Sequence, residues 1–499
     1  MSEKAEYPRL TAAEVAGMVL NGQTLGLGGF TTAGTPKAFA AALGERAERE
    51  QAVGRAFRVN VIGVATGPLI DGVMGRAIDF RTPYQAEPHM RERVNAGECR
   101  FVDMHLSQVT QALRYGFFGP LHWAVLEAAE VTPEGEILLT SCVGPAPTIC
   151  TRAERIVIEL NRRAPLALRG IHDIYEPADP PHRREIPIYR APDRIGEPVL
   201  KVDPAKIAGV IETDSEDEGS GFEDTTPLTA RIGGHVAEFL AGEIAAGRLP
   251  RGFLPVQSGV GNVANGVLGS LGGHPEIPPF EMYTEVVQDA VIRLMEAGRI
   301  TFASCCSLSV SRPALRRVYG SLEWFKQRMV LRPQEITNHP EVLRRLGIIS
   351  INTALEADIF GNVNSTHVLG RRMMNGIGGA GDFTRNAYLS IFTCPSAVKD
   401  GTVSTIVPMV SHTDHNEHSV QVLATEWGVA DLRGRTPRER AEAIIEHCAH
   451  PEYRDALRAY VRLAKDGHTP HTLKEAFAFH ERYERTGDMR VSAGAPPRS

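Results

Sequence analysis

One local pattern occurs near the start of each half of this 499-residue chain: a strand-like run, a glycine-rich turn and a helix-like run. In the first half, residues 25–30 lead through such a turn into residues 37–43. In the second half, residues 253–257 lead through two glycines into residues 264–271. Strands that alternate with helices form parallel sheets with both faces covered. The sequence therefore predicts an α/β protein made of two related open-sheet domains.

The boundary between these domains is predicted from charge. Residues 212–226 carry seven acidic side chains, namely Glu212, Asp214, Glu216, Asp217, Glu218, Glu223 and Asp224. A run of this kind is typical of an exposed connector. We therefore expect an N-terminal domain over residues 1–211, an acidic connector over 212–226, a C-terminal domain over 227–485 that carries the catalytic residue, and a flexible tail over 486–499.

Composition excludes several classes of function. The net charge is −6 and no basic block is present, so nucleic acid is not an expected partner. No apolar run is long enough to span a membrane, and the polar, acidic N-terminus is unlike a targeting segment. The seven cysteines contain no C-x-x-C pair, and the adjacent Cys305 and Cys306 are predicted to be buried thiols. A cytoplasmic location is expected.

The segment Met-Tyr-Thr-Glu-Val-Val-Gln-Asp at residues 282–289 places Glu285 where a strand ends and an apolar-periodic helix begins. Val286 and Val287 are predicted to start that helix, and Gly298 to end it. Unpaired backbone amides at a helix start would keep the carboxylate ionised, and an ionised, positioned carboxylate can act as a nucleophile. The alternative is a first-turn acid without a chemical role.

A second glycine-rich segment must be weighed as a dinucleotide site. Gly376, Gly378 and Gly381 match G-x-G-x-x-G, and Asp400 lies near the expected distance downstream. However, the segment before these glycines is a poor buried strand, and the strand-like residues 389–392 leave little room for a crossover helix. An NAD(P)-binding oxidoreductase therefore remains only a remote alternative. Close approach of the backbone to a ligand is the other use of such glycines.

Five motifs occur together and in order: QSGVGN at 257–262, MYTEVVQD at 282–289, INTALEADIFGN at 351–362, GGAGDFTRNAY at 378–388 and SHTDHNEH at 411–418. With them the chain resembles the class I coenzyme A transferases, in the branch that holds succinyl-CoA:acetate CoA-transferases and acetyl-CoA hydrolases. The resemblance implies two related open-sheet α/β domains with the active site in the cleft between them. It also implies coenzyme A as a substrate and no tightly bound cofactor.

The resemblance assigns roles to individual positions. Glu285 would form a glutamyl-CoA thioester, and the backbone amides of Val260 and Gly379 would face the reacting carbonyl. Asn338 and Glu426 match positions near the site, although a turn asparagine and a paired core acid are equally open interpretations. The positions expected to contact coenzyme A are Gly259, Val260, Gly261, Asn262, Val263, Asn375, Gly379 and Lys399. Lys399 could instead be an ordinary surface lysine.

The histidines at positions 412, 415 and 418 alternate with acids, which suits a metal site, but this spacing does not place all three on one side of a strand or helix. A polar segment without metal is the favoured interpretation. The predicted reaction moves coenzyme A from succinyl-CoA or acetyl-CoA to a short carboxylate such as acetate. No membrane or nucleic-acid partner is expected, and a homodimer is. Acetyl-CoA hydrolysis is the alternative, and a sensor without turnover is a third. The acidic connector, if it borders the cleft, would disfavour succinate.

Overall fold

The computed structural model describes residues 7–219, 225–464 and 466–490. The chain divides into two compact units: the first comprises Met1–Gly221, Phe280–Leu346 and Asn375–Asp382, and the second Phe222–Pro279, Gly347–Met374 and Phe383–Ser499. One crossing between units falls in the predicted connector. The segment that carries Glu285 nevertheless belongs to the first unit and not to a continuous C-terminal domain as predicted. Backbone bridges such as Cys142 to Ser307 and His172 to Leu331 explain this, because they tie the segment to N-terminal residues.

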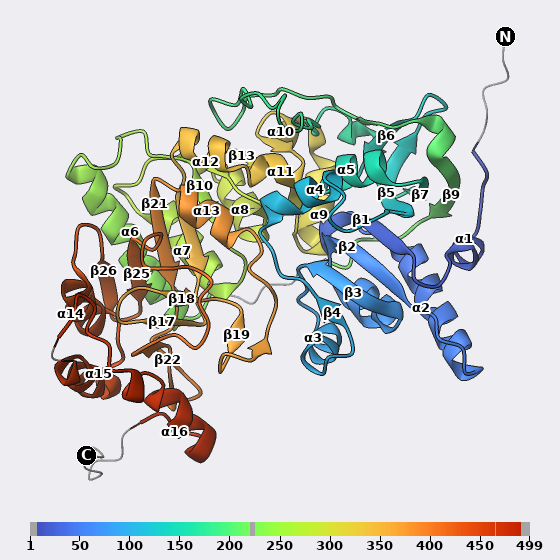
Figure 1. The fold of residues 1–499 in the computed structure, drawn as a ribbon. Helices are drawn as coiled ribbons and strands as arrows, with labels where there is room; N and C mark the ends of the chain where they lie inside the picture. The colour runs from blue at the N-terminus through green and yellow to red at the C-terminus, as the bar shows by residue number, and fades with distance from the viewer. Residues whose placement is uncertain (1–6, 220–224, 465, 491–499) are drawn as a thin grey trace. The chain divides into compact units, whose positions relative to one another are not determined.

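In the described part of the first unit, nine strands form one sheet (Figure 1). Parallel pairing runs in the order β4-β3-β2-β1-β5-β7-β9, and β6 and β8 add antiparallel pairs beside β5. The strands are β1 (Thr24–Thr31), β2 (Val59–Ala65), β3 (Ile78–Pro83), β4 (Arg100–Phe101), β5 (Trp123–Val131), β6 (Glu136–Leu139), β7 (Arg155–Asn161), β8 (Leu200–Lys201) and β9 (Ile207–Thr213). The mostly parallel sheet confirms the predicted α/β class.

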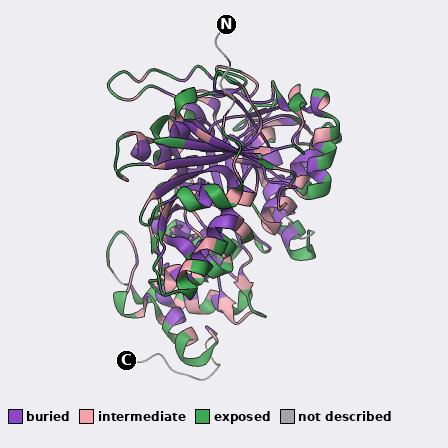
Figure 2. Ribbon diagram, turned by 90° about the vertical axis from the view of Figure 1, so that its right-hand side faces the viewer, coloured by how far each residue is buried: buried purple, intermediate pink, exposed green. Residues whose placement is uncertain are grey.

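Helices pack on this sheet through apolar faces. They include α1 (Ala12–Met18), α2 (Lys37–Ala52), α3 (Pro88–Asn95), α4 (Leu106–Arg114) and α5 (Ala146–Arg152). The capping box of Thr11 and Glu14 begins α1, as predicted, and satisfies backbone amides that the first turn leaves unpaired. Buried side chains of β1, β2 and α2, such as Leu25, Val61 and Phe39, form the core under these helices. Figure 2 shows the strands buried and the outer helix faces exposed.

The first unit also contains the parallel strands β11 (Phe280–Tyr283), β13 (Ile300–Cys305) and β15 (Met329–Leu331). The helix predicted to begin right after Glu285 begins later, as α8 (Asp289–Glu296). Val286 and Val287 instead form the short strand β12, which pairs in parallel with β14 (Ser307–Leu308). Two adjacent β-branched residues favour extended backbone, and the neighbouring strand supplies their hydrogen-bond partners.

The second unit contains the parallel strands β10 (Val256–Ser258), β16 (Ile349–Thr353), β21 (Leu389–Thr393) and β25 (Val422–Thr425), with β26 (Gly428–Asp431) antiparallel at the end. Its helices include α6 (Pro227–Ala245), α7 (Asn262–Gly273), α14 (Pro437–His447), α15 (Pro451–Leu463) and α16 (Ala478–Thr486). The order β10, glycine turn, α7 confirms the second copy of the pattern seen in the first half. Residues 491–499 of the predicted tail lie outside the described residues.

The glycine segment from Gly376 to Gly381 lacks the setting of a dinucleotide fingerprint. The preceding strand β20 (Arg372–Met373) pairs antiparallel with β19 (His367–Val368) in a two-stranded ribbon. As predicted, little room is left for a crossover helix before β21, and only the short helix α13 (Ala380–Asn386) forms there. A seven-residue helix after a ribbon is not the strand–helix crossover of a dinucleotide-binding unit.

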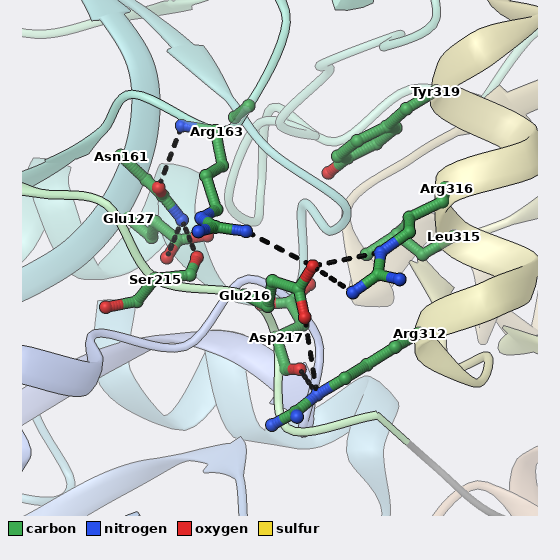
Figure 3. Close-up of a pocket in the computed structure, with 11 residues that line it drawn as sticks. Glu127, Asn161, Arg163, Ser215, Glu216, Asp217, Arg312, Leu315, Arg316 and Tyr319 are labelled. Atoms are coloured by element: carbon green, nitrogen blue, oxygen red, sulfur yellow. Dashed lines mark hydrogen bonds and ion pairs between the residues drawn. The ribbon is translucent and has the colours of Figure 1, made fainter.

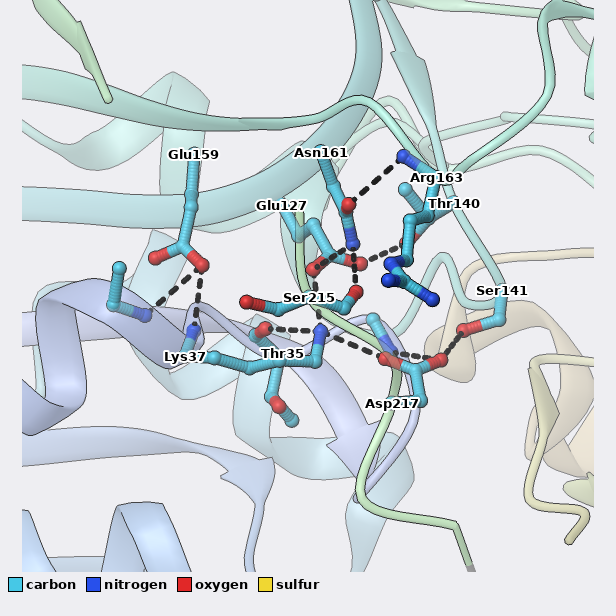
Figure 4. Close-up of polar contacts among 12 residues, drawn as sticks. Thr35, Lys37, Glu127, Thr140, Ser141, Glu159, Asn161, Arg163, Ser215 and Asp217 are labelled. Carbon is cyan, nitrogen blue, oxygen red and sulfur yellow. Dashed lines mark hydrogen bonds and ion pairs between the residues drawn. The ribbon is translucent and has the colours of Figure 1, made fainter. Parts of the chain in front are cut away.

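The acidic connector is less exposed than predicted. Asp217 is buried: its carboxylate lies 2.8 Å from the Lys37 ammonium and accepts a 2.7 Å hydrogen bond from Ser141 (Figure 4). Lys37 also forms a short ion pair with buried Glu127. Because the buried lysine compensates these acids, the segment need not stay in water.

The neighbouring Glu216 lies at the edge of a cavity of ≈ 330 Å³ that Arg163, Arg312 and Arg316 also line (Figure 3). Its carboxylate accepts hydrogen bonds from Arg316 Nε at 2.9 Å and from Arg163 at 3.2 Å. Glu216 and Asp217 are thus paired with cations.

Candidate active site

Glu285 lies at the turn between β11 and β12, in the first unit. The backbone on both sides is fixed, because Thr284 N donates to Ser304 O at 2.9 Å and Cys306 N donates to Glu285 O at 2.8 Å. Beneath the turn, Val286 packs in a small apolar cluster with Cys306 and Leu106. The backbone that carries the carboxyl group is therefore hydrogen-bonded on both sides of the turn.

Asn338 meets Glu285, as the sequence predicted for two residues of one site. Its side-chain amide donates a short hydrogen bond to Glu285 Oε1. Asn338 follows helix α11 (Gln334–Thr337), which is joined to β11 by the 2.8 Å hydrogen bond from Tyr283 Oη to Ile336 O. Thr337 Oγ1 donates to Asn338 Oδ1 at 2.9 Å, so the amide nitrogen is turned toward the glutamate.

Gly379 also lies at this site. A side-chain carbon at position 379 would overlap the Glu285 carboxyl group and the Asn338 amide. The glycine is therefore required by space, since its backbone conformation is not one that other residues avoid. The surrounding segment is held in the first unit by Asp103, which accepts from Ile377 N at 2.9 and 3.1 Å.

Asn375 and Tyr84 border the same segment. A hydrogen bond joins their side chains, and the negative charge of Glu285 is among the influences that raise the pKa of Tyr84, after the larger effect of burial. The ring of Tyr84 lies against Gly376 and Gly378. The sequence pointed to Asn375 but gave no sign of Tyr84, which comes from a distant part of the first unit.

Asp382 is another polar residue of the site that the sequence did not single out. It is buried and accepts a 3.3 Å hydrogen bond from the Asn338 amide. Ser107 donates to it twice, from Oγ at 2.6 Å and from the backbone amide at 3.0 Å. Asp382 lies within the quoted motif GGAGDFTRNAY, so an acid in the first turn after a glycine loop was the available signal; Ser107 had none.

The electrostatics of Glu285 correct a prediction. Burial raises its pKa from 4.5 to about 8, the Asn338 hydrogen bond opposes this rise, and the charge of Asp382 adds to it. The expectation that helix-start amides keep the carboxylate ionised at neutral pH was wrong, because the helix begins only at Asp289. Taken as a whole residue, Glu285 is half-buried. The group is a carboxyl poised between its acid and its carboxylate near neutrality.

The predicted coenzyme A loop belongs to the second unit. Gly259 N donates to Ile351 O at 2.9 Å, which attaches the loop to β16. Val260 is 43% exposed, and Gly261, at φ +109°, precedes the first turn of α7, where Asn262 and Val263 begin the helix. The loop thus presents the start of a helix, a setting suited to phosphate or another anion.

The other two predicted positions of the second unit have clear local partners. Lys399 is exposed, and its ammonium lies 2.5 Å from Tyr483 Oη and 5.1 Å from the centre of that ring. Glu426 is buried and accepts from Ser396 N at 2.8 Å and Ser396 Oγ at 2.5 Å. These contacts match the alternative interpretation of Glu426 as a paired core acid, and the roles of both residues in the reaction stay predictions.

The histidine-rich segment packs with local partners. His415 is buried with its ring 4.8 Å from that of Phe392, and His412 lies 3.3 Å from Asp414. Among the described residues, no group of three or more histidine, cysteine or acidic side chains is arranged to hold a metal. All seven cysteines are buried and free, which confirms that Cys305 and Cys306 are buried thiols. No helix in the described parts of the chain has the length and apolar character needed to cross a bilayer.

Solved structures establish the class of fold. RipA from Yersinia pestis aligns with a TM-score of 0.69 at 21% identity, and the alignment covers 91% of this chain and 97% of the RipA chain. A 4-hydroxybutyrate CoA-transferase from Porphyromonas gingivalis aligns with a TM-score of 0.63 at 22% identity, with the same coverage. The chain therefore has the two-domain α/β fold of these proteins.

Family models and similar proteins identify the family. The acetyl-CoA hydrolase/transferase N-terminal domain matches residues 1–212, and the C-terminal domain of the same name matches residues 315–461. The "Propanoyl-CoA:succinate CoA transferase" of Escherichia coli (strain K12) is 45% identical over 489 residues, 97% of this chain and 99% of the relative. The "Succinyl-CoA:acetate CoA-transferase" of Clostridium kluyveri is 43% identical over 493 residues, 98% and 91% respectively. The "Acetyl-CoA hydrolase" of Schizosaccharomyces pombe is 38% identical, covering 98% and 97%. The chain belongs to the acetyl-CoA hydrolase/transferase family.

Proposed function

We propose that this protein is a CoA-transferase that moves coenzyme A between succinyl-CoA or acetyl-CoA and a short carboxylate through a thioester on Glu285. The observation that carries the proposal is the grouping of Glu285, Asn338 and Gly379. The Glu285 carboxyl group has a pKa of about 8, accepts a hydrogen bond from the Asn338 amide and lies against Gly379, where a side chain would not fit. A positioned carboxylate is a suitable nucleophile for an acyl group.

The reaction begins when a Glu285 carboxylate oxygen attacks the thioester carbonyl. The carbon–sulfur bond breaks, CoA leaves as a thiolate, and a mixed anhydride remains on the enzyme. The thiolate then attacks the glutamyl carbonyl, the anhydride carbon–oxygen bond breaks, and the first carboxylate departs. A second carboxylate reverses the two steps and leaves as the new acyl-CoA. Each covalent state keeps an activated acyl group, so the exchange needs no nucleotide hydrolysis.

In this proposal the chain contributes hydrogen-bond donors and space. Backbone amides at Gly379 and Val260 would stabilise the oxyanions that form at the two carbonyls, and one such donor contributes about 3 kcal/mol to a barrier of this type. The residues proposed to contact coenzyme A are Gly259, Val260, Gly261, Asn262, Val263, Asn375, Gly379 and Lys399. The helix start at Gly261 supports an anionic ligand there.

Acetate and succinate are the proposed carboxylates. Names of two relatives, a propanoyl-CoA:succinate and a succinyl-CoA:acetate enzyme, support both. The charge argument against succinate has lost its basis, because Asp217 is paired with Lys37 and Glu216 with Arg316 and Arg163. Neutralised acids repel a dicarboxylate far less than free ones.

Acetyl-CoA hydrolysis is the second candidate, and the name of the Schizosaccharomyces pombe relative favours it. Transfer is preferred because a hydrolase that used water directly would have no need of a nucleophilic glutamate. Hydrolysis would differ only in whether water reaches the anhydride or the thioester.

The test follows two products at once. Purified protein with acetyl-CoA is assayed with and without succinate, and free thiol and succinyl-CoA are measured separately. Formation of succinyl-CoA well in excess of thiol release supports transfer. Equal thiol release with and without every acceptor tried assigns the protein to the hydrolases. We also propose a cytoplasmic homodimer, and light scattering after gel filtration measures the oligomeric state.

A further inference from the structure

Two carboxyl groups share one amide at this site. The Asn338 side-chain nitrogen donates to Glu285 Oε1 in a short hydrogen bond and to Asp382 Oδ2 at 3.3 Å. A primary amide has two N–H donors, so both are taken up by acids. The amide oxygen accepts from Thr337 Oγ1, which leaves the side chain one orientation.

Asp382 is itself held in place. Ser107 contributes its hydroxyl at 2.6 Å and its backbone amide at 3.0 Å, and it lies in the first turn of α4, where backbone amides have no partner within the helix. Helix α4 is in turn joined to α11: Thr110 Oγ1 and the Arg114 guanidinium contact the Glu335 carboxylate at 2.9 and 2.6 Å. The helix that carries Ser107 and the segment that carries Asn338 are thus braced together.

The negative charge of Asp382 affects the ionised and the acylated forms of Glu285 differently. A neighbouring negative charge disfavours the carboxylate form of Glu285, and it ceases to act on Glu285 once that carboxylate becomes an uncharged acyl group. When Glu285 attacks a thioester, its charge leaves with the CoA thiolate. When the thiolate returns, the charge leaves with the departing carboxylate. Repulsion therefore falls in each acylated state.

We propose that Asp382, anchored by Ser107, is a positioning residue that aims the Asn338 amide at Glu285 and drives the free Glu285 carboxylate toward acylation by charge repulsion. This inference rests on the proposed function of Glu285 as the nucleophile. It assigns a role to the aspartate that acts through Asn338 and not through substrate.

Other titratable groups face Glu285 and must be separated from Asp382. Tyr84 and Cys306 both sense the charge of Glu285, and burial raises the pKa of each, which keeps them neutral near pH 7. A change of charge at position 382 therefore alters the one negative neighbour in this set.

The test compares Asp382→Asn with the native enzyme in the pH dependence of kcat/KM for acetyl-CoA. The variant removes the charge and keeps the size. We expect its inflection to lie at lower pH than in the native enzyme and its plateau to fall by about tenfold or more, because a less basic carboxylate is a weaker nucleophile. In intact-protein mass spectra after incubation with acetyl-CoA, the fraction of glutamyl-CoA thioester should also fall.

Asp289→Asn is the matched control. Asp289 accepts the same pair of hydrogen bonds, from Ser311 N at 2.7 Å and Ser311 Oγ at 2.5 Å, at the start of α8. We expect it to leave the inflection unchanged. Ser107→Ala removes one anchor without changing charge; it should lower kcat/KM and reduce the thioester fraction while shifting the inflection less than Asp382→Asn does.

An inflection in Asp382→Asn that equals the native one overturns the inference, whether or not the rate falls, because a structural role alone could lower the rate without moving the inflection. If Asp382→Asn does not fold, Ser107→Ala decides, and an unchanged rate and thioester fraction in it overturn the inference. Absence of any thioester on Glu285 in the native enzyme would instead reject the proposed function, so the two failures are distinct.

Discussion

Two groups of acids in the first unit differ in whether a cation lies among them. Around Lys37, the carboxylates of Asp217 and Glu127 contact a buried ammonium. Around Asn338, Glu285 and Asp382 share an uncharged amide. The first group contains a cation and joins β5, α2 and the segment after β9, while the second has two carboxyl groups and an uncharged donor. We expect the group around Lys37 to contribute to stability, and we propose the group around Asn338 for the chemistry.

The largest effect is expected when Glu285, the proposed nucleophile of the group around Asn338, is replaced. Glu285→Ala should lower turnover by at least about four orders of magnitude, because no other side chain supplies the attacking oxygen. Trapping the thioester with borohydride should label Glu285 in the native enzyme and nothing in the variant. Glu281→Gln is the control, since Glu281 lies on β11, the strand that leads to Glu285, and burial raises its pKa as well. A label elsewhere, or substantial activity in Glu285→Ala, removes the mechanism.

Breaking the first group should affect stability. Lys37→Met leaves Asp217 and Glu127 buried without a cation, and loss of one partner from a buried ion pair costs about 3–5 kcal/mol. Chemical denaturation measures the free energy of unfolding. Lys326→Met is the control, because its partner Glu323 is largely exposed and surface pairs contribute about 1 kcal/mol or less. If both variants lose the same small amount, the buried cluster is not the stabilising feature proposed.

A substitution at Gly379 tests whether the arrangement of Glu285 and Asn338 requires the absence of a side chain at this position. Gly379→Ala should cut turnover by about a hundredfold, since the added carbon displaces Glu285 and Asn338 and misaims the backbone amide. The backbone at this position is ordinary, so the melting temperature should change little. Gly242→Ala in α6, where an added carbon meets nothing, is the control. Should Gly379→Ala unfold, the glycine is structural and its catalytic assignment falls.

The smallest effect is the pH dependence that uncompensated burial implies. Because the pKa of Glu285 is raised to about 8, kcat/KM should rise with pH below that value and level off above it. A profile that is flat from pH 6 to 9 would contradict the raised pKa. Measurements over about one pH unit on either side of the inflection are enough to detect it.

The same raised pKa has a consequence for stability. The folded state binds the Glu285 proton more tightly than the unfolded state does. The contribution of Glu285 to the free energy of unfolding therefore decreases as pH rises from 4.5 to about 8. Glu285→Gln lacks that loss, and its advantage over the native enzyme in unfolding free energy should grow across the same interval. Partial exposure of the side chain reduces the size of the effect. An advantage that shrinks with rising pH would contradict the sign.

Local sequence patterns predicted a substantial part of the fold. Alternating strand and helix patterns identified the α/β class, and the capping residues Thr11 and Glu14 marked a real helix start. The glycine turn before α7 was also found. These features depend on neighbours a few residues apart, which is the range over which propensity and capping act.

The candidate site was predicted only in part. Glu285, Asn338, Gly379 and Asn375 could be named from motifs, but Ser107 and Tyr84 could not, because each reaches the site through contacts across more than 200 residues. The start of α8 was misplaced because β14 offers Val286 and Val287 a strand partner that no local pattern reveals.

By itself, then, the sequence determined the class of fold, the order of its elements and which glutamate to examine. The tertiary structure decided the unit to which that glutamate belongs, the protonation of its carboxyl group and the pairing of the acids near residue 217. The physical reason is that local backbone preferences act along the chain, whereas burial and charge compensation depend on groups that only folding brings within a few ångströms of each other.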